Sequence, residues 1–354
     1  MHKTIESSEI TVVVQGAVLP ETKECLESIR KHLPGSKIIL STWAGSDLSD
    51  FDADEKILNI DPGAFTYEIE GRKRTNNINR QIVSTLNGLK KVKTKYALKI
   101  RTDFKILKST FLDYFDAFPK YPNDKSWKIF KHKVINYCDL PENCMKIPFF
   151  VTDFAFFGLT EDLLFLFDIP LESEEWGMWF KDKKPSNPDL FNYWHADLAR
   201  FAPEEYIIFS ALSKIQKDIF SVVPDWTYSE KEQFEKGNLF VISNFITLDH
   251  RQFPIDAVGK EYLKALKKRK TFLRFLKNYI TFCDPYYRLP FKYFIEQDHI
   301  IKYFEKLRKE SSYFLNPLVV TAKWIKAFFR LSVLSFSISF KFIFRFLQWV
   351  LKRN

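Results

Sequence analysis

Runs of apolar residues alternate with amphipathic segments through the first hundred residues of the chain. Four short aliphatic or β-branched runs have the character of buried strands: 10–14, 37–40, 56–60 and 96–100. Two longer segments, 20–32 and 76–92, repeat apolar residues every three or four positions, as helices do. The order strand-helix-strand-strand-helix-strand is that of βαβ units. It predicts an α/β domain with a largely parallel, Rossmann-type sheet flanked by helices.

Polar residues follow the carboxyl end of each predicted strand. They are Gln15 and Gly16, residues 41–43, Asp61 and Pro62, and residues 101–103. Open α/β sheets bind ligands in the crevice beyond the carboxyl ends of their strands. We therefore expect these four groups to face one ligand crevice.

A cluster of basic and amide residues, 71–81 (GRKRTNNINRQ), precedes and opens the second predicted helix. The N-terminus of a helix attracts anions, and cations there are unfavourable to the helix itself. The cluster therefore predicts an anionic partner, and a diphosphate fits because arginine binds it through two parallel hydrogen bonds. Asn77, Asn79 and Arg80 are the candidates for this contact. The alternative is a solvated cluster without a ligand.

The charge divides the chain in two. Residues 260–354 hold 21 Lys and Arg against 6 Asp and Glu, whereas the whole chain has a net charge of +10, so the first 259 residues are net acidic. This change predicts an α/β domain at 1–250 and a basic, aromatic-rich helical region at 251–354. An acidic body argues against a nucleic-acid partner, whose basic footprint should include the folded domain.

The last 44 residues, 311–354, contain no acidic residue. Six basic residues there fall within an arc of about 100° on a helix, beside a wide aromatic face: Lys323, Lys326, Arg330, Lys341, Arg345 and Lys352. No uncharged run in this stretch, 331–340 included, is long enough to span a bilayer. Such a helix lies in the interface of an anionic membrane, and the basic stretch 264–277 adds to it. The alternative is a helix docked on its own domain.

Glycine and cysteine positions exclude several classes of site. The 10 glycines have neither dinucleotide-fingerprint nor P-loop spacing, and the four cysteines match no zinc motif. Met1 is followed by His2 and Lys3 rather than by an apolar run. We therefore expect no secretory signal, and a cytoplasmic protein with reduced thiols.

Several segments resemble the WavE family of lipopolysaccharide-synthesis proteins. They are 13–16 (VVQG), 24–30 (ECLESIR), 39–43 (ILSTW) with 45–47, 76–92, 96–103 (YALKIRTD), 152–158 (TDFAFFG) with 160–162, and 202–206 (APEEY). The resemblance covers about residues 10–212 and leaves the basic tail outside. It implies a glycosyltransferase of the GT-A fold class in the assembly of a surface glycan, lipopolysaccharide or capsule. The substrates it implies are a nucleotide-sugar donor and a lipid-linked or oligosaccharide acceptor.

A transferase of this class must neutralise the diphosphate that leaves the donor sugar. The resemblance implies a divalent cation, Mg²⁺ or Mn²⁺, held by an Asp-x-Asp motif, but this chain has Arg101-Thr102-Asp103 with only the second acid. Either Asp103 holds the cation alone, or Arg101 and the basic cluster stabilise the charge without metal. The expected donor site consists of Gln15, Gly16, Asn77, Asn79, Arg80, Arg101 and Asp103.

An inverting transferase also needs a carboxylate that deprotonates the acceptor hydroxyl. Asp153 is the first candidate because it interrupts an apolar run, and Glu204 and Glu205 are the others. Each has a structural alternative: hydrogen bonding to backbone for Asp153, and helix capping for the two glutamates. His195 and Asp197 form only a weak metal pair, since no third ligand is evident.

Two other functions use some of the same features. A nucleotide-handling phosphotransferase of glycan assembly would use the same crevice, and a non-catalytic peripheral membrane adaptor would use only the tail. We expect glycosyl transfer at the cytoplasmic face of the inner membrane, with the protein attached peripherally to anionic lipid.

Overall fold

The computed structural model describes residues 5–69, 72–115, 127–137, 149–188, 191, 198–228, 230–248 and 252–258. The chain divides into two units, Met1–Leu266 and Lys267–Asn354, and every described residue belongs to the first. The predicted membrane-binding helix and the pair His195 and Asp197 lie outside the described residues.

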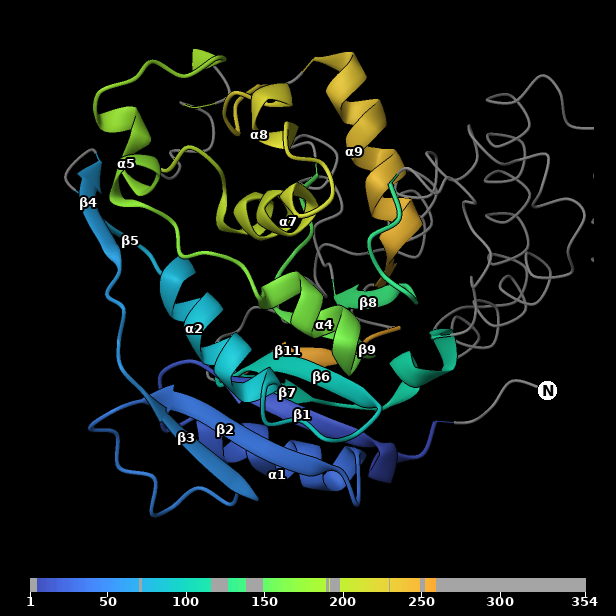
Figure 1. Cartoon of the computed structure of the whole chain (residues 1–354). Helices are drawn as coiled ribbons and strands as arrows, with labels where there is room; N and C mark the ends of the chain where they lie inside the picture. Colours follow the sequence, from blue (N-terminus) through green and yellow to red (C-terminus); the bar gives the residue numbers. More distant parts are fainter. Residues whose placement is uncertain are drawn as a thin grey trace, which may run out of the picture. The chain divides into compact units, whose positions relative to one another are not determined.

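A seven-stranded mixed sheet forms the centre of the first unit, in the order β10-β8-β9-β6-β1-β2-β3 (Figure 1). Its strands are β1 (Ile10–Gln15), β2 (Lys37–Trp43), β3 (Glu55–Asn59), β6 (Tyr96–Arg101), β8 (Val134–Tyr137), β9 (Ala155–Leu159) and β10 (Phe245–Leu248). β1 runs parallel to β2 and β6, β2 to β3, and β10 to β8, whereas β9 is antiparallel to both of its neighbours. All four predicted strands are present, as β1, β2, β3 and β6, and the mainly parallel sheet is confirmed.

Helices cover both faces of the sheet because its central strands are buried on both sides. Every residue of β1 is buried, as expected of an apolar run in a parallel sheet. The two predicted helices are α1 (Thr22–His32) and α2 (Ile78–Leu89). α2 lies against β1, β2 and β3, and a Cβ at Gly88 would meet Val13 Cγ1 at 2.3 Å. α1 contacts β7 (Phe104–Ile106), where the Ser28 hydroxyl accepts the Ile106 N–H at 2.9 Å.

A hairpin of β4 (Phe65–Ile69) and β5 (Arg72–Asn76) stands between β3 and α2, at the upper left of Figure 1. The sequence predicted a basic helix opening here, but residues 72–76 form a strand and the helix begins at Ile78. Lys73 and Arg74 are exposed on that strand. The interpretation that this cluster opposes the helix dipole is therefore wrong for all of its basic residues except Arg80.

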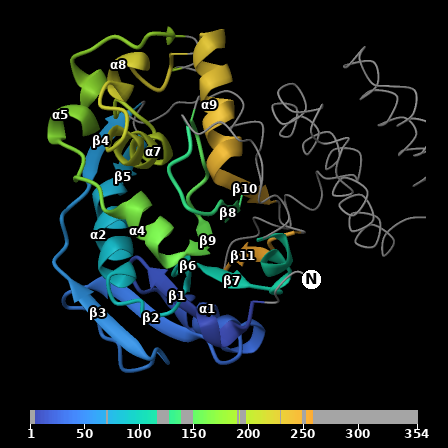
Figure 2. The same ribbon diagram turned by 45° about the vertical axis from the view of Figure 1, so that its right-hand side comes forward.

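A helical layer lies over β6 and β9, on the same side of the sheet as α2 (Figures 1 and 2). It contains α4 (Thr160–Phe167), α5 (Glu174–Gly177), α7 (Pro203–Ser213), α8 (Ile219–Val222) and α9 (Lys231–Asn244). α4 packs against β9, α2 and α7. The short turns η1 (Ser7–Glu9), η2 (Thr110–Tyr114) and η3 (Trp179–Lys181) complete the described helices. β11 (Ile255–Ala257) lies past the predicted boundary at 250 and pairs with β7.

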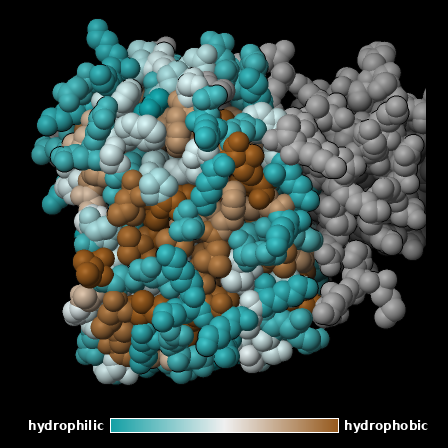
Figure 3. Space-filling model, in the orientation of Figure 1, coloured by the Kyte–Doolittle hydropathy of each residue, from teal (hydrophilic) through white to brown (hydrophobic). Residues whose placement is uncertain are grey.

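The surface in Figure 3 is mixed, with apolar side chains gathered in groups between polar ones. Large apolar residues that are exposed include Leu19, Leu58, Ile60, Leu171 and Ile215. Within the described part of the chain, the helices are too short or too polar for any of them to cross a bilayer.

Candidate functional site

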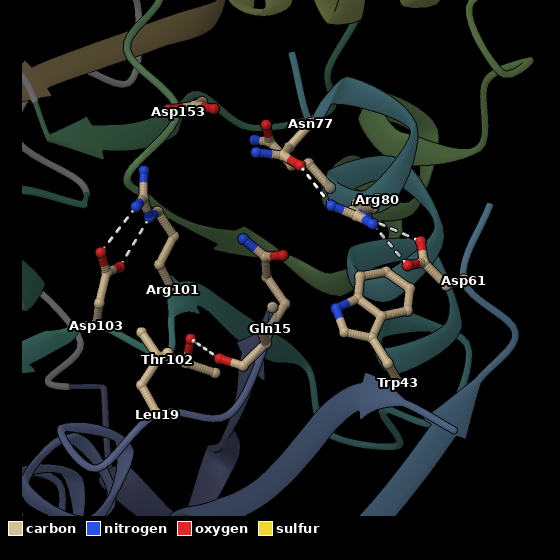
Figure 4. Close-up of a pocket in the computed structure, with 13 residues that line it drawn as sticks. Gln15, Leu19, Trp43, Asp61, Asn77, Arg80, Arg101, Thr102, Asp103 and Asp153 are labelled. Atoms are coloured by element: carbon tan, nitrogen blue, oxygen red, sulfur yellow. Dashed lines mark hydrogen bonds and ion pairs between the residues drawn. The ribbon is translucent and has the colours of Figure 1, made fainter. Parts of the chain in front are cut away.

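A cavity of about 460 Å³ opens at the carboxyl ends of β1 and β6 (Figure 4). The chain continues from β1 to β2 on one side and returns through α2 to β6 on the other. The cavity therefore lies at the topological switch point, where open α/β sheets bind ligands, and its volume is that of a small-molecule site. It is lined by Gln15, Gly16, Ala17, Leu19, Trp43, Asp61, Asn77, Arg80, Gln81, Arg101, Thr102, Asp103 and Asp153. Each of the four predicted polar groups at the strand ends contributes to this lining.

The turn after β1 forms the floor of the cavity. Gly16 has a φ of +120°, which disfavours other residues, and its N–H donates to the Ser41 carbonyl at 3.1 Å. The Thr102 N–H donates to the Gln15 carbonyl at 3.1 Å, so the turn is tied to both neighbouring strands. The Ser84 hydroxyl donates to Gln15 Oε1 at 2.7 Å, and the amide nitrogen of Gln15 faces the cavity.

Arg101 is held rigidly at one wall. Its Nε donates to Asp103 Oδ1 at 2.9 Å and its Nη2 to Oδ2 at 2.8 Å. The rings of Phe104 and Phe154 lie 5.5 and 5.6 Å from its Cζ atom. Burial alone would lower the pKa of Arg101, but the hydrogen bonds and charge of Asp103, with the charge of Asp153, outweigh burial and raise it. Arg101 is a permanent, oriented cation.

The ion pair between Arg101 and Asp103 bears on the predicted role of Asp103 as the ligand of a divalent cation. Both of its carboxylate oxygens accept hydrogen bonds from Arg101. A divalent cation at those oxygens would also meet the repulsion of the guanidinium. Among the described residues, no group of three His, Cys, Asp or Glu side chains is placed to hold a metal. Asp103 in this arrangement does not fit a cation site.

A second arginine–aspartate pair stands at the opposite wall, beside the Trp43 indole (Figure 4). Arg80 donates from Nε and Nη2 to the two carboxylate oxygens of Asp61, at 2.8 and 2.7 Å, and from Nη1 to Asn77 Oδ1 at 3.0 Å. The hydrogen bonds from Arg80 lower the pKa of Asp61, and those to Asp61 raise the pKa of Arg80. Each of the two arginines that line the cavity is therefore paired with an aspartate. The sequence predicted a cluster of basic residues for an anionic ligand, whereas the structure shows two arginine–aspartate ion pairs.

Asp153 completes the lining from the segment before β9. Its side chain is buried, and its backbone carbonyl accepts a hydrogen bond from the ammonium group of Lys99. Lys99 lies at the centre of β6 with no exposed surface, and burial lowers its pKa to about 8, partly opposed by the charge of Asp153. Lys99 was not among the predicted site residues, although a lysine inside the apolar strand 96–101 (YALKIR) is a signal that the sequence offers.

Three predicted site residues lie outside this lining. The Asn79 side chain is bound to the backbone of Glu172, with Nδ2 donating to its carbonyl at 3.0 Å and Oδ1 accepting its N–H at 2.7 Å. Glu205 is fully buried and accepts the Ala202 N–H at 3.2 Å, so it caps α7, and burial raises its pKa well above the usual range. Glu204 does not line the cavity, although its charge acts on Arg101 and Lys99.

The comparisons with known proteins give one clear relationship. No curated protein is significantly similar to the chain. A sequence model of the family described as WavE lipopolysaccharide synthesis matches residues 10–309. The match includes every lining residue of the cavity and extends past the predicted resemblance of 10–212 into the basic region. Because the match covers most of the sequence, the chain belongs to the WavE lipopolysaccharide synthesis family.

Proposed function

We propose that this protein is a GT-A-like glycosyltransferase that moves a sugar from a nucleotide-sugar to a surface-glycan acceptor of the lipopolysaccharide or capsule type. Membership of the WavE family supports a role in lipopolysaccharide synthesis. The observation that carries the proposed reaction is one cavity, at the switch point of the sheet, that contains both an oriented cation, Arg101, and a carboxylate, Asp153.

Arg101 is the proposed contact of the donor diphosphate. Its Nε and Nη2 atoms are bound to Asp103, and the rest of the guanidinium points into the cavity toward Asp153 (Figure 4). A cation held in place before the reaction stabilises the charge that develops on the leaving diphosphate without reorganising during the reaction. Arg80, in the first turn of α2, and Asn77, which immediately precedes that helix, face the same cavity and offer a second polar contact. No step of this proposal uses a metal ion.

Asp153 is the proposed general base in an inverting transfer. The oxygen of the acceptor hydroxyl attacks the anomeric carbon, and the bond from that carbon to the diphosphate oxygen breaks. The electron pair of the broken bond leaves with the diphosphate, and the hydroxyl proton passes to Asp153. We expect Asp153→Asn to abolish transfer while donor binding and folding persist. Full turnover in that variant would contradict the assignment.

Binding of nucleotide-sugars to the full-length protein tests the proposal first. Thermal unfolding is followed with UDP-, GDP-, CMP- and dTDP-linked sugars, since a ligand of the folded state raises its melting temperature. We expect at least one of them to stabilise the wild type. Arg101→Gln should remove that stabilisation. Arg30→Gln is the matched control, because Arg30 binds two carboxylates, of Asp52 and Asp54, but does not line the cavity.

The outcomes separate the three candidate functions. Stabilisation by a nucleotide-sugar with release of its nucleotide supports the glycosyltransferase. Stabilisation by nucleotides, with phosphoryl transfer and no sugar release, favours the phosphotransferase. Absence of any nucleotide effect on the wild type contradicts both and leaves the non-catalytic adaptor.

We also propose that the basic part of residues 251–354 that follows β11 attaches the enzyme peripherally to the cytoplasmic face of the inner membrane, where a lipid-linked acceptor is found. The support is the sequence: no acid in 311–354, and six basic residues on one helical stripe, each worth about 1 kcal/mol at an anionic surface. Truncation after Glu310 should weaken binding to anionic liposomes, and salt should weaken binding of the full chain. Equal binding to neutral and anionic liposomes would contradict the proposal.

A further inference from the structure

Lys99 is a charged residue in the core that the proposed reaction does not use. It sits at the centre of β6, opposite Val13 of β1 and Phe156 of β9 in the register of the sheet. None of its surface is exposed, so it cannot touch a ligand in the cavity. Its position two residues before Arg101 places both side chains on the same face of the strand.

The ammonium group of Lys99 meets backbone rather than a carboxylate. It donates to the carbonyl oxygen of Asp153, and the rings of Phe156 and Phe167 lie 5.7 and 5.8 Å from Nζ. Among the ion pairs of the described residues, none includes Lys99. The segment it holds, residues 151–153, has no regular secondary structure and leads into β9.

The charges around Lys99 come from three parts of the chain, and most belong to the cavity. Asp153 precedes β9, Arg101 and Asp103 end β6 and its turn, and Glu204 lies on α7. The three acids favour the charged lysine, and Arg101 opposes it. These are the groups that act on Arg101 as well. Lys99 therefore interacts electrostatically with the charged residues of the cavity, although it is buried beneath them.

A structural role alone does not account for this lysine. A buried ammonium without a carboxylate partner loses its hydration, and an aliphatic residue at the centre of a sheet avoids that loss. The neighbours Phe156 and Phe167 offer an apolar environment that methionine or leucine would fill. What an aliphatic residue cannot supply is a donor to the Asp153 carbonyl and a positive charge beneath the cavity.

We propose that Lys99 is a positioning residue: its ammonium group anchors the segment that carries Asp153 and balances the Asp153 carboxylate at the cavity wall. The role of that carboxylate as a base rests on the proposed function, whereas the anchoring and the charge balance do not. The ionisation of Asp153 is therefore the property to measure, because it requires no known donor.

Three variants of the full-length protein test the proposal. Lys99→Met removes the charge and keeps an unbranched side chain, and Lys99→Arg keeps the charge. Lys95→Met is the matched control, because Lys95 is exposed and immediately precedes the same strand. Circular dichroism and thermal unfolding establish that each variant is folded.

The readout is the reaction of Asp153 with a water-soluble carbodiimide and glycinamide, followed by mass spectrometry over a range of acidic pH. Carbodiimides react with protonated carboxyl groups, so labelling falls as the carboxylate forms. In Lys99→Met we expect the pH midpoint of labelling at Asp153 to rise, because the positive charge that favours its carboxylate is lost. Lys99→Arg and Lys95→Met should keep the wild-type midpoint. Simple loosening of the segment would change the labelling rate at every pH and leave the midpoint in place.

An unchanged midpoint in a folded Lys99→Met protein overturns the proposal. If Lys99→Met does not fold, the charge-conserving variant Lys99→Arg tests the proposal instead. A folded Lys99→Arg protein with a raised labelling midpoint at Asp153 then overturns the proposal. Once a donor is found, Lys99→Met should lower kcat and leave the KM of the donor within about twofold, since Lys99 does not reach the cavity. A wild type that binds no nucleotide-sugar contradicts the proposed function, and the labelling result still decides the role of Lys99.

Discussion

Replacing Lys99 by methionine should remove a pH dependence from the stability of the protein. Burial lowers the pKa of Lys99 from 10.5 to about 8, against the opposing charge of Asp153. Between these two pH values the unfolded chain carries a proton on this lysine that the folded chain has lost. The free energy of unfolding of the wild type therefore rises with pH across this window. Below and above the window Lys99 adds no pH dependence.

The magnitude follows from the width of the window. One pKa unit corresponds to about 1.4 kcal/mol, so the fall from 10.5 to about 8 corresponds to about 3 kcal/mol. Lys99→Met lacks both the cost of burying the charge and the hydrogen bond to the Asp153 carbonyl. The free energy of unfolding of the wild type, minus that of Lys99→Met, should therefore increase by about 3 kcal/mol from pH 8 to pH 10.5.

Urea unfolding followed by tryptophan fluorescence, in steps from about pH 7.5 to about pH 10.5, measures this difference. Subtracting one protein from the other cancels the groups that titrate equally in both. Lys95→Met removes an exposed lysine, so it shows how the loss of one positive charge at the surface changes the free energy of unfolding. Parallel stability curves for the wild type and Lys99→Met across the whole range would refute the reasoning, because a lysine that stays protonated in the fold cannot produce the slope.

Three further predictions follow from single contacts. Gly88→Ala should lower the free energy of unfolding by about 1–3 kcal/mol in urea, because the new methyl group would meet Val13 at 2.3 Å; wild-type stability would contradict the close packing of α2 on β1. The folded state holds a proton on Glu205 that the unfolded chain releases near pH 4.5. The wild type should therefore lose stability relative to Glu205→Gln as the pH rises above that value, and the Tm of both proteins measured against pH checks this. Arg80→Ala should weaken binding of a nucleoside diphosphate by about 1–3 kcal/mol in calorimetry. Asp61→Asn, which weakens the contacts that orient the same guanidinium, should reduce the affinity less. Unchanged affinity in Arg80→Ala would show that the donor does not contact this wall of the cavity.

The sequence by itself determined the central strands, the two helices that connect them and the edge at which polar residues gather. Those features follow from local patterns: apolar runs for β1 and β6, helical spacing for α1 and α2, and strand ends that must meet at one edge of a parallel sheet. The position of the cavity at that edge could be predicted for the same reason.

The β4–β5 hairpin was not predicted, although β4 (65–69, FTYEI) alternates apolar and polar residues as a strand does. Its partner β5 gives no such signal. Lys73, Arg74 and Thr75 are all exposed, so the strand has no alternation of apolar and polar positions, and basic residues beside a strong helix were read as part of that helix. β5 becomes a strand because it pairs with β4, and the pattern of residues within β5 does not reveal that pairing.

Only the tertiary structure decided what each polar side chain does. Asn79 lies at the opening of a helix, yet a contact with Glu172, 93 residues away, uses its amide. Asp61 and Arg80 are 19 residues apart and neutralise each other, and Lys99 reaches a carbonyl 54 residues away. Hydrogen bonds and ion pairs depend on distances of a few ångströms, which the packing of separate elements sets. Residue type and spacing therefore located the site, and long-range packing fixed its charges.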